Sequence, residues 1–371
     1  MKKNIITLLG CSLLLSACGG DSSGSGSDAA AGDSVSYSSK QINAASYSDW
    51  VYFDLSSGEI PDFSAGEAAA SADWDIAFRR YDVMLNGGAS GPGHVAGAVA
   101  DAQDEFYAGG EADASVFTNA VADNYVDDLD GPYDLSSLTF VTDSNEAVID
   151  GWYVYDMTTH TISANTSVGW LLRHADGESY SKFTLISASY SGVSVSYETQ
   201  AADTVQFAGG GKTISAVIAD GETAVCLDFD SEAVVSCDSA AWDLRYEIDM
   251  AARQLAIWTN GGVYGDGNGA AFGSVDAIEL ASYTSATTLD STSIVSLYSQ
   301  DASAGIFSAY SWWEYGLAGG HKIWPNFRTY VIDTDTSDEN SEKYTLQIVN
   351  YYSLGASGSP EIRYQLITED E

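Results

Sequence analysis

The stretch NGGASGPGH at residues 86–94 has the composition of a loop that could cradle a phosphate, form a turn or shape a pocket. A phosphate-binding loop lies between a strand and a helix and usually has a lysine near its end. No lysine follows closely, and the alanine-rich segment around 94–118 contains glycines that leave room for at most a short helix. Asn-Gly-Gly tolerates positive φ, so we predict a sharp turn.

The four cysteines fall into two groups. Cys11 and Cys18 belong to the N-terminal segment, whereas Cys226 and Cys237 flank the ten residues LDFDSEAVVS. Two thiols at this spacing in an exported chain predict a disulfide that closes a hairpin. A metal site would need more ligands than this pair offers.

Motifs of catalysis are absent from the sequence. It contains neither GxSxG nor HExxH, and no cysteine is left over as a nucleophile, so we expect a protein that is not an enzyme. The acidic clusters at 127–134 and 333–342 offer oxygen donors of the kind that calcium prefers. Structural calcium is one interpretation, and chance clustering among 53 acidic residues is the simpler one.

The N-terminus has the pattern of a lipoprotein signal peptide. In the predicted signal-peptide segment 1–18, Lys2 and Lys3 precede a short apolar run, and LSAC ends at Cys18, the residue expected to carry the lipid. Residues 19–44 begin with a Gly/Ser-rich segment that predicts a flexible tether. Gly19 follows the cysteine, and the predicted location is the outer membrane, facing the periplasm or the cell surface.

The formal net charge of −39 restricts the partners. A surface so acidic repels nucleic acid and anionic lipid head groups, so we expect no nucleic-acid binding and membrane contact only through the lipid anchor.

The candidate residues named so far must be positioned by secondary-structure elements, and the sequence predicts that these are strands. SVSYETQ, KYTLQIVNYY and IRYQLI alternate apolar with polar residues and are rich in Tyr, Val, Ile and Thr, which is typical of half-buried strands. Turn residues separate them at short intervals. The pattern predicts an all-β protein with antiparallel sheets.

Five motifs occur twice in the same order. The pairs are VYFDL and VCLDF, WDIAF and WDLRY, NGGASGPGH and NGGVYGDGN, WYVYDMTTHTI and WWEYGLAGGHKI, and KFTLISASY and KYTLQIVNY. Five matches in register indicate an internal duplication. We therefore predict two tandem β-sandwich-like domains, at 45–205 and 206–371.

The run WDIAFRRYDVMLNGGASGPGHVAGAV at 74–99 resembles the HmuY family of haem-binding bacterial surface lipoproteins. WVYFDLSSGEI, WYVYDM and KFTL continue the likeness through the first half, and WDLRYEID, NGGVYGDGNG and WWEY extend it more weakly into the second. The resemblance implies an all-β protein whose loops hold haem between two projecting fingers, with two histidine or two methionine side chains on the iron.

One family ligand lies five residues after the tryptophan of WYVYDM, which is the position of Met157 here. The matching position in the second half is Leu317, which cannot bind iron. The second ligand would lie between the glycine turn and this tryptophan, but residues 98–151 and 270–311 contain neither histidine nor methionine. The chain departs from the family there.

The histidines are the alternatives for an axial ligand. His160 and His321 stand at matching positions of the two halves, where a structural hydrogen bond is the competing interpretation. His94 ends the glycine turn and is otherwise an exposed turn residue. His174, in LLRHADG, is expected to be a solvated hairpin residue.

Aromatic and cationic residues complete the candidate pocket. Tyr153, Trp313 and Trp324 are candidate walls for a flat ring, and Arg79 and Arg80 are candidates for pairing with haem propionates. Either arginine could instead pair with a neighbouring aspartate.

The resulting hypothesis is an outer-membrane lipoprotein that binds haem or a related tetrapyrrole and delivers it to a receptor, of which a TonB-dependent outer-membrane receptor is the candidate. Met157 is the leading ligand. The alternative is a cofactor-free adhesion or glycan-binding module, because tandem β domains rich in Tyr and Trp on a lipid tether suit that function equally well.

Overall fold

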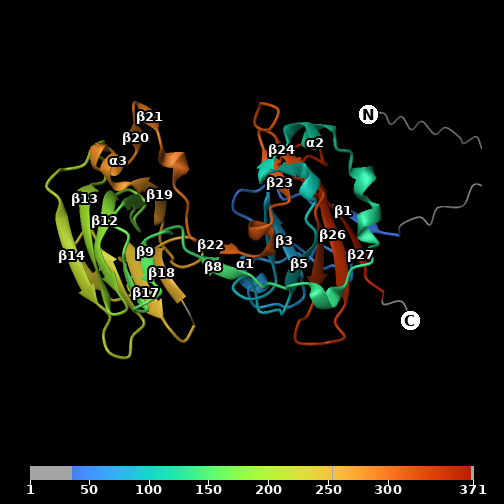
Figure 1. Ribbon diagram of the computed structural model, residues 1–371, viewed down its shortest axis with the longest axis horizontal. Coiled ribbons are helices and arrows are strands. Elements are labelled where there is room, and N and C mark those ends of the chain that lie inside the picture. Colours follow the sequence, from blue (N-terminus) through green and yellow to red (C-terminus); the bar gives the residue numbers. More distant parts are fainter. Residues whose placement is uncertain (1–35, 253, 369–371) are drawn as a thin grey trace, which may run out of the picture. The chain divides into compact units, whose positions relative to one another are not determined.

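The computed structural model describes residues 36–252 and 254–368 (Figure 1). Antiparallel strands dominate, as predicted, and the fold is all-β. The predicted signal peptide, Cys18 and most of the predicted tether lie outside the described residues. The end of that predicted tether is folded, because strand β1 (Ser38–Gln41) pairs with β27 and Ile42 is fully buried.

Two sandwich-like lobes are present, each with its own core. Lobe 1 comprises residues 36–143 and 305–368. Its five-stranded sheet has the order β1, β27 (Glu361–Leu366), β26 (Lys343–Asn350), β25 (Thr329–Asp333) and β5 (Ala96–Asp101). Its second sheet contains β2 (Val51–Phe53), β3 (Ile76–Arg79) and β4 (Asp82–Leu85). Side chains from both sheets form one core, which includes Phe53, Phe78, Tyr330, Leu346 and Ile362.

Lobe 2 comprises residues 147–301 and has the same plan. Its five-stranded sheet has the order β14 (Lys212–Val217), β13 (Gly192–Gln200), β12 (Tyr180–Ser189), β11 (Val168–Arg173) and β19 (Ala270–Asp276). Its second sheet has the order β16 (Ala233–Val235), β15 (Ala224–Asp228), β17 (Leu244–Asp249) and β18 (Gln254–Thr259). Trp152, Trp170, Phe183, Phe229 and Tyr246 lie in its core.

The lobes do not coincide with the halves predicted from the motifs. The predicted boundary at 205–206 falls between β13 and β14, which pair with each other in the sheet of lobe 2. Strand β5 follows the first glycine turn but pairs with β25 of the second half, whereas β19 follows the second glycine turn and pairs with β11 of the first half. Each lobe therefore combines strands of both halves. In Figure 1, blue strands lie beside red ones in lobe 1, and green strands lie beside orange ones in lobe 2.

The chain passes between the lobes at two short strands. β8 (Ser144–Glu146) and β22 (Ala302–Ala304) pair with each other, with Asn145 opposite Ser303. A buried aspartate precedes each strand. The carboxylate of Asp143 accepts hydrogen bonds from Leu85 N and Ser90 Oγ, and that of Asp301 accepts them from Thr259 N and Val148 N. These bonds attach each passage to the glycine-turn region of its lobe.

Two hairpins lie next to the sheets. One joins β9 (Tyr153–Asp156) to β10 (Thr161–Ala164), and the other joins β23 (Trp313–Tyr315) to β24 (Ile323–Pro325). The smaller elements are α1 (Ala65–Ala68), β6 (Tyr107–Ala108), β7 (Glu111–Ala112), α2 (Ala114–Asn119), α3 (Ala277–Ser282), β20 (Thr288–Leu289), β21 (Thr292–Ser293), α4 (Ile306–Ala309) and the 3-10 turns at 104–106, 122–125, 127–129, 135–137 and 295–297.

Both glycine runs form turns, each fixed by its leading asparagine. The amide of Asn86 donates to Trp74 O at 2.8 Å and its carbonyl accepts from Gly93 N at 3.1 Å. Asn260 makes the matching bonds to Trp242 O and from Gly267 N. Each glycine run is thus the predicted turn, and the hydrogen bonds of its asparagine hold the loop in place. The predicted disulfide between Cys226 and Cys237 is also present, closing the β15–β16 hairpin.

Candidate functional site

Met157 lies at the tip of the β9–β10 hairpin, and its side chain is 77 % exposed. Val154 and Tyr155 on the same hairpin are also exposed, so with Met157 three large apolar or aromatic side chains of this hairpin face solvent. Isolated exposed apolar residues are ordinary on protein surfaces, but a group on one hairpin is a candidate contact surface.

His160 shares this tip. The Tyr155 hydroxyl and His160 Nδ1 are 2.8 Å apart, and His160 has a φ of 55°. His321 makes the same contact on the other hairpin, where its Nδ1 lies 2.5 Å from the Tyr315 hydroxyl. The repeated pair orients each ring and leaves Nε2 without a protein partner among the described residues. Both imidazoles therefore have a structural hydrogen bond and a nitrogen available for a ligand.

The two hairpins differ at the position predicted to hold iron. Leu317 is half-buried and packs in a cluster with Phe106, Phe117, Phe327 and Trp324. In lobe 1 the space beside this hairpin is therefore filled by the protein's own aromatic side chains. Met157, the matching residue, remains exposed.

The predicted pocket residues are not gathered in one place. Tyr153 packs against Trp152 in lobe 2, with ring centroids 4.6 Å apart. Trp313 and Trp324 lie on the β23–β24 hairpin, where Trp313 contacts Tyr81 and Trp324 carries the Lys322 ammonium 3.8 Å from its ring centroid. The candidate walls therefore belong to two different hairpins.

The cationic candidates have other partners. Arg79 pairs with Asp82 at 3.1 Å and lies over the Trp50 ring, and Arg80 lies over the Tyr47 ring and donates to Ala45 O. His94 is exposed in lobe 1, and its carbonyl accepts hydrogen bonds from Thr336. These residues lie away from the strands of the Met157 hairpin, which belong to lobe 2.

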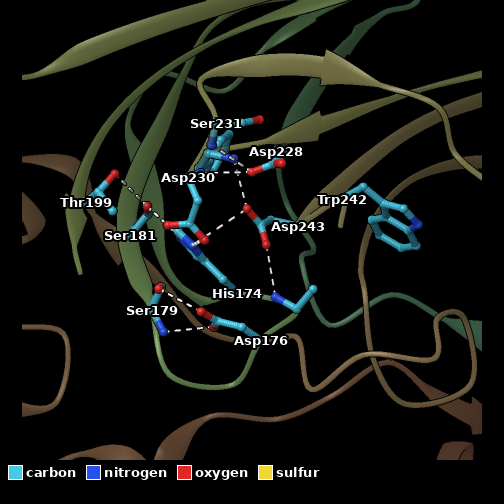
Figure 2. A network of polar contacts seen from close by, with 12 residues as sticks. His174, Asp176, Ser179, Ser181, Thr199, Asp228, Asp230, Ser231, Trp242 and Asp243 are labelled. Atoms are coloured by element: carbon cyan, nitrogen blue, oxygen red, sulfur yellow. Dashed lines mark hydrogen bonds and ion pairs between the residues drawn. The ribbon is translucent and has the colours of Figure 1, made fainter. Parts of the chain in front are cut away.

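A buried polar network surrounds His174, contrary to the solvated position expected from the sequence (Figure 2). Its Nδ1 lies 2.9 Å from Asp230 Oδ2 and 3.6 Å from Asp243 Oδ2, and its Nε2 lies 2.8 Å from Ser181 Oγ. Asp243 also accepts hydrogen bonds from Ala175 N and Phe229 N. Sequence reasoning missed this site because the LLRHADG segment resembles an ordinary hairpin turn.

Burial and the two carboxylates act on His174 in opposite directions. Burial lowers the pKa of the imidazole, but the Asp230 hydrogen bond and the Asp243 charge outweigh it and raise the pKa above its ordinary value of 6.5. Burial raises the pKa of Asp243 to about 6, while the His174 charge opposes that shift. The network therefore favours a charged imidazolium held between two carboxylates.

The same atoms could serve other chemistry. His174, Asp230 and Asp243 offer ligand atoms within 4.8 Å of one another, a set that can hold a divalent cation. The order Asp–His–Ser resembles a hydrolase triad, but Ser181 is fully buried in strand β12, so no substrate reaches its hydroxyl. The network is best explained as a structural ion pair.

The predicted calcium clusters are used in other ways. Asp128 accepts a hydrogen bond from Gln103, and Asp333 pairs with Lys343 at 3.1 Å. Asp335 and Asp338 accept hydrogen bonds from backbone amides two residues further on. These contacts explain the clusters as turn caps, and calcium binding stays a prediction.

Comparison with family models gives a match to HmuY protein over residues 46–198. Residues 46–198 are thus similar to the HmuY family. A search of curated proteins finds no match. The HmuY region begins in lobe 1 and ends in strand β13 of lobe 2, so the exchange of strands between lobes divides it.

Three of the predicted ligands, Met157, His160 and His94, lie inside the HmuY region, whereas His321 lies beyond it. Met157 and His160 place a thioether and an imidazole on one exposed tip, and both are donors of the kind that haem iron can bind. Residues 98–151, between the glycine turn and Trp152, contain no histidine or methionine that could bind the opposite side. None of the helices in 36–252 and 254–368 has the length and hydropathy of a membrane span.

Proposed function

We propose that this protein binds haem or a related tetrapyrrole at the tip of the β9–β10 hairpin. The observation that carries the proposal is the exposed thioether of Met157 beside His160, inside the HmuY-family region. An exposed methionine gains nothing from packing, so a contact outside the chain would account for it.

The geometry favours one axial ligand from this hairpin. Met157 and His160 are close in sequence on one tip, so they offer alternative donors to the same face of the iron. Val154 and Tyr155 supply the apolar and aromatic contact that a porphyrin edge requires. Thioether sulfur is a soft ligand, so reduced haem should bind Met157 better than oxidised haem does.

Titration with haemin, with and without dithionite, tests the proposal. A Soret shift that saturates, and that weakens at least about tenfold in Met157→Ala, supports the assignment; this loss corresponds to about 1.4 kcal/mol. His160→Ala then tells which donor reaches the iron.

Met250→Ala is the matched control, because Met250 is 63 % exposed elsewhere in lobe 2. His321→Ala controls for the equivalent hairpin tip of lobe 1. A titration with no spectral change in either oxidation state, or an equal loss in Met157→Ala and Met250→Ala, contradicts haem binding at this tip.

We further propose that the chain is anchored in the outer membrane through Cys18, faces the periplasm or the cell surface, and delivers its ligand to a TonB-dependent receptor without catalysing a reaction. The N-terminal pattern supports the anchor. Cys18→Ser should move the protein from the membrane fraction to the soluble fraction, and unchanged fractionation would contradict the anchor.

A further inference from the structure

A polar cavity of about 420 Å³ opens beside the second glycine turn in lobe 2. Trp242, Arg245 and Tyr264 line it together with Asp238, Asp266 and backbone of the turn. Trp242 lies just before strand β17, next to Asp243. Figure 2 shows the Trp242 ring pointing away from the His174 network, so neighbouring residues serve two separate environments.

The matching surface of lobe 1 is covered by the chain itself. There the segment before Trp74 forms helix α1, and the Trp74 indole N–H donates to Ala68 O at 3.1 Å. Ala68 and Phe63 pack with Trp74 in one apolar cluster. Lobe 2 carries the disulfide hairpin in this part of the sequence and has no helix over Trp242 among its described residues.

This difference leaves hydrogen-bond donors without partners at the cavity. Among residues 36–252 and 254–368, the buried Arg245 Nε–H has no protein acceptor. The Trp242 indole N–H has none either, but it is not among the buried unpartnered atoms and is reached by solvent. The accessible Trp242 indole N–H can donate to an external acceptor, and one such hydrogen bond contributes about 1 kcal/mol net. In lobe 1 the equivalent indole already has its acceptor.

The cavity wall is rigid before any ligand arrives. Tyr264 stacks on Trp258 with ring centroids 4.0 Å apart and an interplanar angle of 3°. The carboxylate of buried Glu247 accepts hydrogen bonds from the Tyr264 hydroxyl and Trp258 Nε1, and from Arg245 Nη2 at 2.9 Å. A wall fixed in this way loses little conformational entropy on binding.

The residues that build this wall are specific to lobe 2. The motif pairs place Ala77, Met84 and Ser90 of lobe 1 at the positions of Arg245, Trp258 and Tyr264. The donors and the aromatic surface therefore occur together only where the covering helix is missing from the described lobe.

The charges of the lining select the chemical class of the ligand. Glu247 neutralises Arg245, and Asp238 and Asp266 add negative charge in a chain of net charge −39, so an anion is disfavoured. The N–H groups of Trp242 and Arg245 have no lone pair to offer a cation, so they favour a ligand with hydrogen-bond acceptors. A neutral ligand rich in hydroxyl groups can accept from Trp242 and Arg245 and donate to the aspartates.

We propose that this cavity is a carbohydrate-binding site for a neutral sugar ring. The ring lies against Tyr264, its oxygens accept from Trp242 Nε1 and Arg245, and its hydroxyls donate to Asp238 and Asp266. The site is independent of the haem proposal, because none of its lining residues belongs to the β9–β10 hairpin.

Saturation-transfer NMR and calorimetry with methyl glycosides of glucose, galactose, mannose and N-acetylglucosamine test the site, with methyl glucuronoside as the anionic probe. We expect saturable binding of at least one neutral glycoside and weaker binding of the glucuronoside. Trp242→Phe, which removes only the indole N–H and part of the ring, should weaken binding about fivefold, the value of one net hydrogen bond.

Trp74→Phe is the matched control, since it makes the same change in the covered surface of lobe 1 and should leave sugar binding unchanged. Asp266→Asn, at the exposed rim, provides a second variant whose folding is not at risk and should weaken binding as well. The proposal is overturned if no neutral glycoside binds, if the glucuronoside binds more tightly, or if Trp242→Phe and Trp74→Phe have equal effects.

Discussion

The β9–β10 and β23–β24 hairpins share a framework but differ in what their tips do. Each begins just after a buried tryptophan, Trp152 or Trp312, and each carries a Tyr–His contact near its turn. Leu317 packs into an aromatic cluster of lobe 1, whereas Met157 extends into solvent. The β23–β24 hairpin therefore packs its Leu317 side chain within lobe 1, whereas the β9–β10 hairpin exposes Met157, where a ligand could reach it.

The buried aspartates before β3 and β17 provide a second contrast. Asp75 accepts a hydrogen bond from Leu55 N, and Asp243 accepts the matching bond from Phe229 N. Asp243 also faces the His174 cation. Burial, with help from the negative charges of Asp54 and Glu342, raises the pKa of Asp75 to about 7. At this position the negative charge of the buried aspartate is balanced by His174 in lobe 2. In lobe 1 the charges that act on Asp75 are negative.

The largest expected effect concerns Asp243. His174→Gln removes the cation and leaves Asp243 buried without a counter-charge, which should lower the free energy of unfolding by about 3–5 kcal/mol. The pKa of His174 is raised in the folded state, so its contribution is complete below about pH 6.5 and is lost as pH rises through the folded-state pKa. Urea unfolding at pH 6, followed by tryptophan fluorescence, measures the loss.

His94→Gln, at an exposed position, serves as the control and should stay within about 0.5 kcal/mol of the native protein. Adding Asp243→Asn to His174→Gln should recover part of the stability. A His174→Gln protein as stable as the control would mean that the network does not hold a charged pair.

The next effect concerns Asp75. A carboxyl group with a raised pKa binds more protons in the folded state than in the unfolded state between about pH 4 and pH 7, so stability falls as pH rises through that range. Asp75→Asn removes this dependence. Relative to the native protein, the variant should gain roughly 2–4 kcal/mol between pH 4 and pH 8.

Urea unfolding of both proteins across this pH range gives the difference directly. Because the amide side chain introduced by Asp75→Asn still offers an oxygen to Leu55 N, the hydrogen bond itself is kept. A difference in stability that does not vary with pH would show that Asp75 is ionised in the folded protein at all these pH values, as in an ordinary exposed carboxylate.

The smallest effect separates the two hairpins. Leu317→Ala removes a half-buried side chain and should cost about 1 kcal/mol, less than the roughly 2–5 kcal/mol of a fully buried leucine. Met157→Ala removes an exposed side chain and should change stability by less than about 0.5 kcal/mol. Thermal unfolding of both variants tests the contrast, and equal losses would show that Met157 is packed in solution.

Local features of the sequence predicted the local structure well. Alternating segments such as SVSYETQ became strands, Asn-Gly-Gly became a pinned turn, and the cysteines at a hairpin spacing became a disulfide. Each of these depends on residues close together in the chain. The HmuY resemblance, seen first in the run at 74–99, is confirmed by the family match over 46–198.

The features that the sequence did not predict depend on contacts between segments that are far apart in the chain. Strands β11 and β25 both follow the same type of hairpin and present similar apolar faces, so the sequence cannot tell which of them β5 pairs with. His174 lies 56 residues before Asp230, and nothing local indicates that they meet. The polar cavity also escaped prediction, because it depends on the lack of a covering helix in the described part of lobe 2.

The pairing of β13 with β14 has a practical consequence for cutting the chain. Cleavage in the connection between them would yield two polypeptides, each contributing strands to both sandwiches. The sheets β2–β3–β4 and β16–β15–β17–β18 would each stay within one piece, but both five-stranded sheets would be divided between the two pieces, so the fragments should stay associated like the subunits of an interlocked dimer. Truncation at this point therefore removes half of each lobe instead of isolating one of them.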